Sequence, residues 1–271
     1  MGNLKWLLAL LAAVMSLCSY CATTVHNPIT DEDQRVALSV EQEIALGEAS
    51  APQIASEYGG MLPNREIQAI VDSVGDRLVD RSVVRQTNYK FEFTVLAENE
   101  VINAFALPGG PIFITRALFD RLETEDQLAG VLSHEIGHVV ARHAAEQLAK
   151  AQLTEGLAGA AVIAAYDPED PQSGRQTAAI SQIVGQIVNM RYGRVDELES
   201  DQLGVRFMIE ADYDPYAMIE VMEILDESGP GLRPPEFFST HPNSSNRIEK
   251  IQEAIEAQTS DGVPAAELTK E

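Results

Sequence analysis

Cysteine is nearly absent from this chain. The only two, Cys18 and Cys21, follow directly after an apolar N-terminal run. If the chain is cleaved there, the remaining domain has no disulfide, so a fold held together by disulfide bonds is excluded. The apolar run itself, Trp6 to Met15, is too short to span a bilayer comfortably.

Basic residues are also scarce. The chain has 19 Lys and Arg against 42 Asp and Glu, which gives a net charge of −23. Such an acidic surface repels phosphate backbones, so we expect no nucleic-acid partner. It also disfavours docking on anionic lipid by charge alone, and its simplest meaning is solubility through self-repulsion. With 271 residues, 45% of them hydrophobic, the chain has ample length for one sizeable core.

The first 21 residues have the pattern of a secretory signal. Lys5 precedes the apolar run, and small and polar residues follow it. A cysteine at this place suggests a bacterial lipoprotein, with Cys21 the better candidate for lipidation. Leu17 and Tyr20 precede the two cysteines, however, where a lipoprotein signal usually has a small residue. Ordinary cleavage and a signal-anchor therefore stay open as alternatives. The expected location is the bacterial periplasm, with membrane contact only through the N-terminus.

The rest of the chain divides into a linker at 22–38, one domain at 39–258 and a tail at 259–271. Alternating apolar residues predict a strand at 91–96, and the turn Pro108-Gly109-Gly110 predicts a hairpin between Val101–Leu107 and Pro111–Thr115. The expected class is α+β, mostly helical, with a small sheet beside one central helix. Helical spacing and capping residues predict helices over 39–58, 64–79, 124–150, 176–192, 194–211, 215–228 and 245–258.

Residues 134–138 read His-Glu-Ile-Gly-His, the HExxH motif, within the predicted helix 124–150. Residues four apart share a helix face, so the imidazoles of His134 and His138 can bind one metal ion. Glu135 is turned by about 100° and can address a water on that metal. The motif therefore predicts a zinc-activated water that attacks a peptide carbonyl. The alternative is a helix with two ordinary surface histidines.

A catalytic zinc needs a third protein ligand and an open fourth position. His143 would lie on the opposite helix face from His134 and is expected to pack or hydrogen-bond instead. Glu197 and Asp201 are four apart on a second predicted helix, so one can bind the metal while the other accepts a ligand's ring N–H. Glu199 faces about 200° away from Glu197 and is its competitor. An exposed acidic turn is the alternative reading of this segment.

These segments resemble the gluzincin metallopeptidases, and more narrowly the family that contains type I CAAX prenyl protease, HtpX and the periplasmic protease BepA. The resemblance covers about residues 41–255, although Ser200 stands where the family usually has Ala. It implies a mostly helical zincin-type domain and one Zn²⁺ per chain. The long apolar spans of the integral-membrane members are absent here, which points to the exported, soluble or lipid-anchored branch. The roles implied are His134, His138 and Glu197 as metal ligands, Glu135 as general base and Asp201 as partner of a ligand histidine.

Three further segments gain roles through the resemblance. Asn103, Ala104 and Phe105 match a strand at the edge of the cleft, to which an extended substrate can add through main-chain hydrogen bonds; a structural hairpin strand is the alternative. His241 could stabilise an oxyanion, or take the fourth zinc position and hold the enzyme latent, or be an ordinary loop histidine. Arg247 could pair with a substrate carboxylate or with local acids.

The function expected from these features is a zinc metalloendopeptidase that hydrolyses exported or envelope proteins in protein quality control. A periplasmic chaperone or assembly factor for outer-membrane proteins, with a latent or structural zinc site, is the main alternative. Its partners would include the outer-membrane assembly machinery. A zinc hydrolase acting on a non-peptide amide is the second alternative.

Overall fold

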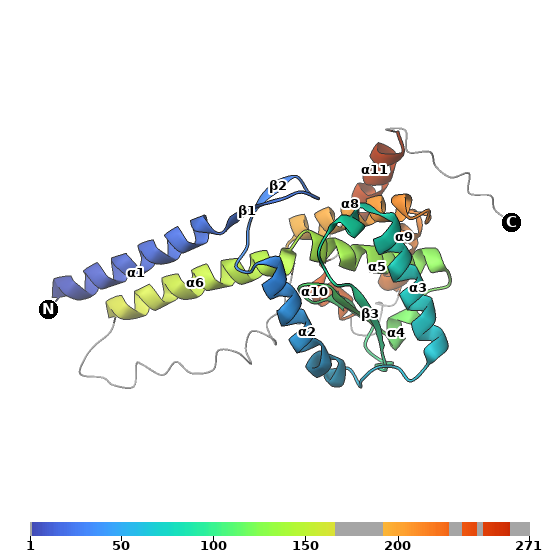
Figure 1. The fold of residues 1–271 in the computed structure, drawn as a ribbon, viewed down its shortest axis with the longest axis horizontal. Coiled ribbons are helices and arrows are strands. Elements are labelled where there is room, and N and C mark those ends of the chain that lie inside the picture. The colour runs from blue at the N-terminus through green and yellow to red at the C-terminus, as the bar shows by residue number, and fades with distance from the viewer. Residues whose placement is uncertain (1, 166–191, 228–234, 243–245, 261–271) are drawn as a thin grey trace.

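The computed structural model describes residues 2–165, 192–227, 235–242 and 246–260 (Figure 1). Nearly all of the predicted helix 176–192 lies outside these ranges. The strands are β1 (Thr24–Asn27), β2 (Glu32–Arg35), β3 (Glu92–Leu96), β4 (Ala104–Ala106) and β5 (Pro111–Thr115). The helices are α1 (Gly2–Ala22), α2 (Val40–Glu57), α3 (Arg65–Arg81), the 3-10 helix η1 (Val83–Gln86), α4 (Arg116–Phe119), α5 (Glu125–Val140), α6 (His143–Ala165), α8 (Arg194–Glu210), α9 (Ala217–Glu227), α10 (Phe237–Thr240) and α11 (Arg247–Ser260).

The predicted class, α+β with mostly helices and a small sheet, is confirmed. Helix starts follow from local side chains that bond otherwise unpaired N–H groups. Ser39 and Gln42 form a reciprocal capping box at the start of α2. Asn64 caps α3, and Thr124 accepts a hydrogen bond from the backbone N–H of Gln127 at the start of α5.

The three-stranded sheet has the order β3-β5-β4, in which β3 is parallel and β4 antiparallel to β5. The predicted strand and the predicted hairpin are both confirmed, but β4 is shorter than the expected 101–107. The turn needs Gly109 and Gly110, whose φ angles of 85° and 131° are open mainly to glycine. This topology places β4 at one edge of the sheet.

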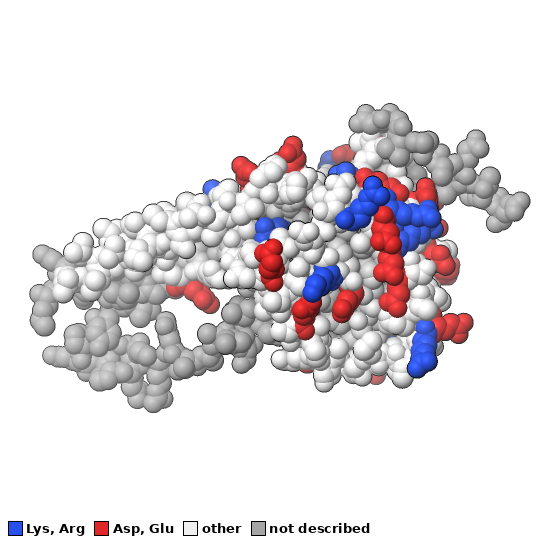
Figure 2. All heavy atoms as spheres, in the orientation of Figure 1, with Lys and Arg blue, Asp and Glu red and all other residues white. Residues whose placement is uncertain are grey.

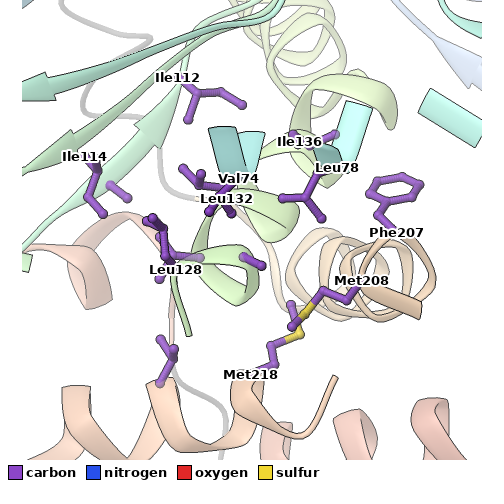
Figure 3. Close-up of a cluster of buried hydrophobic side chains, with 14 of the residues drawn as sticks. Val74, Leu78, Ile112, Ile114, Leu128, Leu132, Ile136, Phe207, Met208 and Met218 are labelled. Atoms are coloured by element: carbon purple, nitrogen blue, oxygen red, sulfur yellow. The ribbon is translucent and has the colours of Figure 1, made fainter. Parts of the chain in front are cut away.

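Helix α5 forms the centre of the core (Figure 3). It packs against α3, α8, α9 and β4, and its buried face includes Leu128, Leu132 and Ile136. Gly137 sets the spacing to α8, because a Cβ there would lie 2.9 Å from the carbonyl oxygen of Ser200. Ser200 and the acidic residues around it can therefore approach the motif closely. The labelled side chains that other elements contribute to this cluster are Val74, Leu78, Ile112, Ile114, Phe207, Met208 and Met218.

The prediction that one helix runs from 124 to 150 is wrong. Helix α5 ends at Val140, Arg142 adopts a left-handed φ of 60°, and α6 begins at His143. A left-handed residue is costly for arginine and persists only where other contacts hold it. Here the buried Arg142 guanidinium bonds to the carboxylate of Glu43, with 2.9 Å from Nε to Oε1, and to the carbonyl of Leu38.

Residues 22–38, expected as a linker, contain the antiparallel hairpin β1–β2. Its two buried side chains, Asn27 and Gln34, face the end of α5. Asn27 Nδ2 donates to the carbonyl of Val140 at 2.8 Å, and Gln34 Nε2 donates to the carbonyl of Ala141. These amides satisfy carbonyl groups that the end of a helix leaves unpaired. The hairpin is therefore part of the folded domain.

Helices α1 and α6 lie side by side and extend away from the rest of the molecule (Figure 1). Figure 2 shows that this arm carries few charged side chains, in contrast to the body. Both cysteines are exposed on α1. No helix in the described ranges combines the length and apolar character needed to cross a membrane.

Candidate metal centre

Helix α5 turns its motif histidines toward one point. The Nε2 atoms of His134 and His138 lie 3.0 Å apart, and both rings are buried. The sequence alternative of two surface histidines is therefore wrong. Glu135, between them, is fully buried as well.

Two further residues complete a group of four. Glu197 on α8 places its Oε1 3.4 Å from His138 Nε2 and its Oε2 3.6 Å from His134 Nε2. His241, directly after α10, has its Nδ1 3.1 Å from Glu197 Oε1. One ligand atom from each of His134, His138, Glu197 and His241 lies within 4.8 Å of the others, an arrangement that could hold a metal ion. Two or three imidazoles with one carboxylate are a donor set typical of zinc.

The hydrogen bond between His134 and Asp201 indicates which ring nitrogen of His134 carries the proton. His134 Nδ1 lies 2.9 Å from Asp201 Oδ1, and a carboxylate only accepts, so the proton sits on Nδ1. With a single proton on the ring, His134 turns the lone pair of Nε2 toward the centre, 3.0 Å from Nε2 of His138. Two lone pairs at this distance repel each other unless a proton or cation lies near both.

The charges of the buried groups also favour a divalent cation. Glu135, Glu197 and Asp201 are three carboxylates with at most 2% exposure, and Arg247 is the one arginine among the described residues that lies between them. If all three acids are ionised and the histidines are neutral, two negative charges remain uncompensated, and buried charges are normally paired or bind metal. Both oxygens of Glu135 and Nε2 of His241 lack a hydrogen-bond partner within the described part of the chain. Residues and charge thus fit a bound zinc ion.

The electrostatic environment acts differently on each group. Burial lowers the pKa of His138 well below its usual value, which keeps the ring neutral and available as a ligand. Burial acts to raise the pKa of Glu197, but the nearby rings of His241 and His138 outweigh it and hold that pKa well below its usual range. Burial raises the pKa of Glu135, against the opposing effect of His241 and His134. Burial acts to lower the pKa of His241, but Glu197 and Glu135 outweigh it and raise that pKa.

Asp201 and Arg247 form a layer behind the four central residues. Arg247 donates from Nε to Asp201 Oδ2 at 2.7 Å and from Nη2 to Oδ1 at 2.9 Å, and its Nη1 lies 3.0 Å from Glu197 Oε2. Asp201 therefore makes the contact to His134 that the family resemblance implies. Arg247 is buried and pairs with local acids, which is one of the two roles expected for it.

His143 lies next to the centre, not on the opposite side of a continuous helix. The break at Arg142 brings His143 Nδ1 to 2.8 Å from His138 Nδ1. It is not one of the four converging residues, as expected. Glu199, the competitor of Glu197, bonds His143 Nε2 at 3.0 Å and so does not reach the centre. Glu197 and Asp201 are buried, so the segment is not an exposed acidic turn.

Two aromatic residues at the site were not predicted. Tyr192 stacks on the ring of His138, with centroids 4.0 Å apart and planes at 22°. Phe237 stacks on His241 at 4.5 Å and 20°. Phe237 lies four residues before His241 and so shares its turn, which could have suggested the contact. Tyr192 stands alone before α8, and its sequence surroundings give no such signal.

The expected edge-strand residues lie on or directly before β4, which packs against α5. Asn103 is buried, and its Nδ2 lies 3.4 Å from Glu236 Oε1, an atom that also accepts from the Tyr58 hydroxyl at 2.7 Å. The ring of Phe105 belongs to a small apolar cluster and stacks on Phe113. The strand is thus at a sheet edge, with its side chains turned into the protein.

Paired histidines on one helix, with a glutamate from the neighbouring helix, define the site of an HExxH metallopeptidase. Residues 63–255, well over half of the chain, match the sequence profile of peptidase family M48, and the chain belongs to this family.

Relatives of this chain include bacterial and mitochondrial proteases. It is 30% identical over 259 residues to the beta-barrel assembly-enhancing protease of Escherichia coli (strain K12), which covers 90% of this chain and 51% of that protein. It is 31% identical over 240 residues to the mitochondrial metalloendopeptidase OMA1 of Schizosaccharomyces pombe, covering 86% and 67%. It is 28% identical over 240 residues to the human metalloendopeptidase OMA1, mitochondrial, covering 84% and 45%. The chain spans about half the length of the assembly-enhancing proteases that it matches.

Proposed function

We propose that this protein is a zinc metalloendopeptidase with one Zn²⁺ per chain, held by His134, His138 and Glu197. The observation that carries the proposal is the convergence of these three side chains with His241 in a buried group within 4.8 Å. Membership of peptidase family M48 supports the same activity. The alternative of a non-peptide amide substrate has no comparable support.

The chain's own residues supply acid–base chemistry beside the metal. Bound zinc contributes Lewis acidity, which acidifies water toward a pKa of ~7 and polarises a carbonyl. Glu135 takes the proton from the attacking water and passes it to the leaving amine. The raised pKa of Glu135 and its two oxygens, which have no hydrogen-bond partner among the described residues, suit both tasks. His241 Nε2, 3.6 Å from Glu135 Oε1, donates to the developing oxyanion.

The edge strand β4 binds the substrate in extended form in this proposal. Hydrogen-bonded and open positions alternate along an antiparallel pair. Asn103 and Leu107 bond to β5 and its flanking residues, so the main-chain groups of Ala104 and Ala106 point to the open side. Main-chain bonding there positions a peptide while tolerating many sequences. Asn103, Ala104 and Phe105 remain the proposed substrate-binding residues.

The described structure is a closed form of this site. None of His134, Glu135, His138, Glu197 and His241 is more than 3% exposed, so a peptide bond does not reach them. The segment that carries α10 covers the centre, and its Phe237 N–H donates to the carbonyl of Ile102 at 3.2 Å. His241 in the fourth ligand position would keep the enzyme latent until this segment moves.

This closure favours a second candidate, a chaperone or assembly factor whose zinc site is latent or structural. One relative is named a beta-barrel assembly-enhancing protease, which supports envelope proteins as clients. We propose that the protein is exported, with Cys21 as the candidate lipid attachment site on α1. Under either candidate its partners are polypeptides, and outer-membrane assembly machinery is a further proposed partner.

Cleavage of fluorogenic casein by the full chain tests the proposal. Zinc-dependent cleavage that a chelator abolishes is expected, together with faster cleavage by His241→Ala if that residue enforces latency. Loss of cleavage in Glu135→Gln at unchanged zinc content would locate the activity in this centre. No cleavage by the wild-type chain or by His241→Ala would favour the chaperone function.

A further inference from the structure

Glu199, His143 and the proposed metal ligand His138 form a hydrogen-bonded series, in addition to the one that joins Arg247, Asp201 and His134. His138 Nδ1 lies 2.8 Å from His143 Nδ1, and His143 Nε2 lies 3.0 Å from Glu199 Oε2. We propose that Glu199 and His143 are positioning residues that fix the ring orientation and tautomer of His138. This inference rests on the proposed function, because it assigns a purpose to these residues only if His138 binds zinc.

The chemistry of the groups decides where the protons sit. The carboxylate of Glu199 only accepts, so His143 carries its proton on Nε2. With a single proton on the His143 ring, its Nδ1 has a lone pair, and His138 must donate to it from its own Nδ1. This leaves His138 Nε2 unprotonated and directed at the centre, the form that a zinc ligand needs. One carboxylate thus sets the tautomers of two rings in series.

The three residues of this hydrogen-bonded series lie on three separate helices, α5, α6 and α8. Arg142, with its left-handed backbone, ends α5 one turn after His138 and turns His143 back toward it. Glu199 reaches His143 from α8, whose neighbouring Ser200 places its hydroxyl 3.4 Å from the same Nδ1. Tyr192 stacks on the face of the His138 ring and resists tilting of the ring. The bond at Nδ1 fixes which ring nitrogen faces the centre.

The two proposed histidine ligands are supported in different ways. His134 is bonded directly to Asp201, whose charge is compensated by Arg247. His138 is bonded to the imidazole of His143, and the carboxylate of Glu199 lies behind that ring. Loss of the His143 acceptor leaves the His138 Nδ1–H without its partner and lets the proton move to Nε2, which blocks the ligand lone pair. Removing such a partner typically weakens metal binding by about 10- to 100-fold.

Zinc affinity of the full chain, measured by competition with a chromophoric chelator, tests the proposal. His143→Leu removes the acceptor and should bind zinc about 10- to 100-fold more weakly than wild type. His143→Asn should recover most of this loss, because its Oδ1 can stand where Nδ1 was. The visible absorption bands of the cobalt-substituted protein should shift in His143→Leu and return in His143→Asn, which a merely structural role would not produce.

Glu199 supplies an independent test. Glu199→Leu should weaken zinc binding in the wild-type background but cost nothing further in the His143→Asn background, because asparagine does not extend to Glu199. Glu223→Leu, which removes an exposed carboxylate from α9, is the matched control and should leave zinc affinity unchanged. If His143→Leu is too poorly folded to measure, as judged by circular dichroism, the Glu199 pair carries the test.

Equal zinc affinity in wild type and His143→Leu would overturn the inference, and so would an additive loss in the double variant. Either result would leave the proposed function intact, provided that the wild-type chain binds zinc and cleaves casein. A wild-type chain that binds no zinc would instead refute the proposed function.

Discussion

Replacing Glu135 by Gln should abolish turnover and, in the metal-free protein, increase stability. The Glu135 side chain is fully buried, and neither oxygen has a hydrogen-bond partner among the described residues. The nearest group that can carry a positive charge is His241, at 3.6 Å. A buried polar group left unsatisfied costs about 1–3 kcal/mol, and more when charged. Glutamine removes the charge but still lacks partners, so we expect a gain of about 1 kcal/mol in unfolding free energy.

The pH dependence of this gain follows from the raised pKa of Glu135. Burial makes the folded protein bind the Glu135 proton more tightly than the unfolded chain does. The stability of the wild type therefore falls as pH rises from the unfolded pKa of about 4.3 through the raised folded pKa. Glutamine does not titrate, so the advantage of the variant should be absent near pH 4 and largest at alkaline pH.

Urea unfolding in the presence of a chelator, at pH values between 4 and 9, measures this difference. Glu223→Gln, in an exposed position on α9, is the control and should match the wild type throughout. The zinc-loaded Glu135→Gln protein should lose at least a factor of about 10² in casein cleavage, the lower end of the contribution of a general base. A metal-free variant that is less stable than wild type at alkaline pH, or one that retains turnover, would refute the reasoning.

Three other substitutions test the architecture of the centre. His134→Ala should lose its metal, because one of three proposed protein ligands is gone; elemental analysis showing wild-type zinc content would contradict this. Gly137→Ala should lower the unfolding free energy by about 1–3 kcal/mol in urea titrations, because its Cβ would lie 2.9 Å from the carbonyl oxygen of Ser200; an unchanged midpoint would show that α8 can move at no cost. Arg247→Leu should cost about 3–5 kcal/mol by the same measurement, since it leaves the buried Asp201 carboxylate without its cation; a loss below about 1 kcal/mol would contradict the pairing.

Local sequence signals were sufficient for most elements and for the central residues. Ser39, Asn64 and Thr124 begin their helices as capping residues because the bonds they make span only two or three residues. The four-residue spacings of the motif and of Glu197 with Asp201 predicted shared faces, because helical geometry alone determines them. The turn before β5 was predicted in the same way from its glycines.

Features that depend on contacts with distant parts of the chain could not be predicted from the sequence. The helical pattern continues through residues 139–150, and nothing local indicates a break. The break is held by hydrogen bonds from Asn27 and Gln34, which lie more than 100 residues earlier in the chain. The neighbourhood of His143 was mispredicted for this reason, because its position depends on the break. The stacking of Tyr192 on His138 likewise depends on tertiary packing alone.

The contact between the β1–β2 hairpin and the end of α5 has a practical consequence for shortened versions of the protein. A fragment that starts at α2 lacks the two amides that cover the carbonyls of Val140 and Ala141, a few residues after His138. Fraying would then begin beside a proposed ligand. Trimming the chain just before Thr24 spares the hairpin, whereas proteolytic nicking between β1 and β2 would release it from the helix end. Expression boundaries and protease sensitivity at this point therefore bear on the integrity of the centre itself.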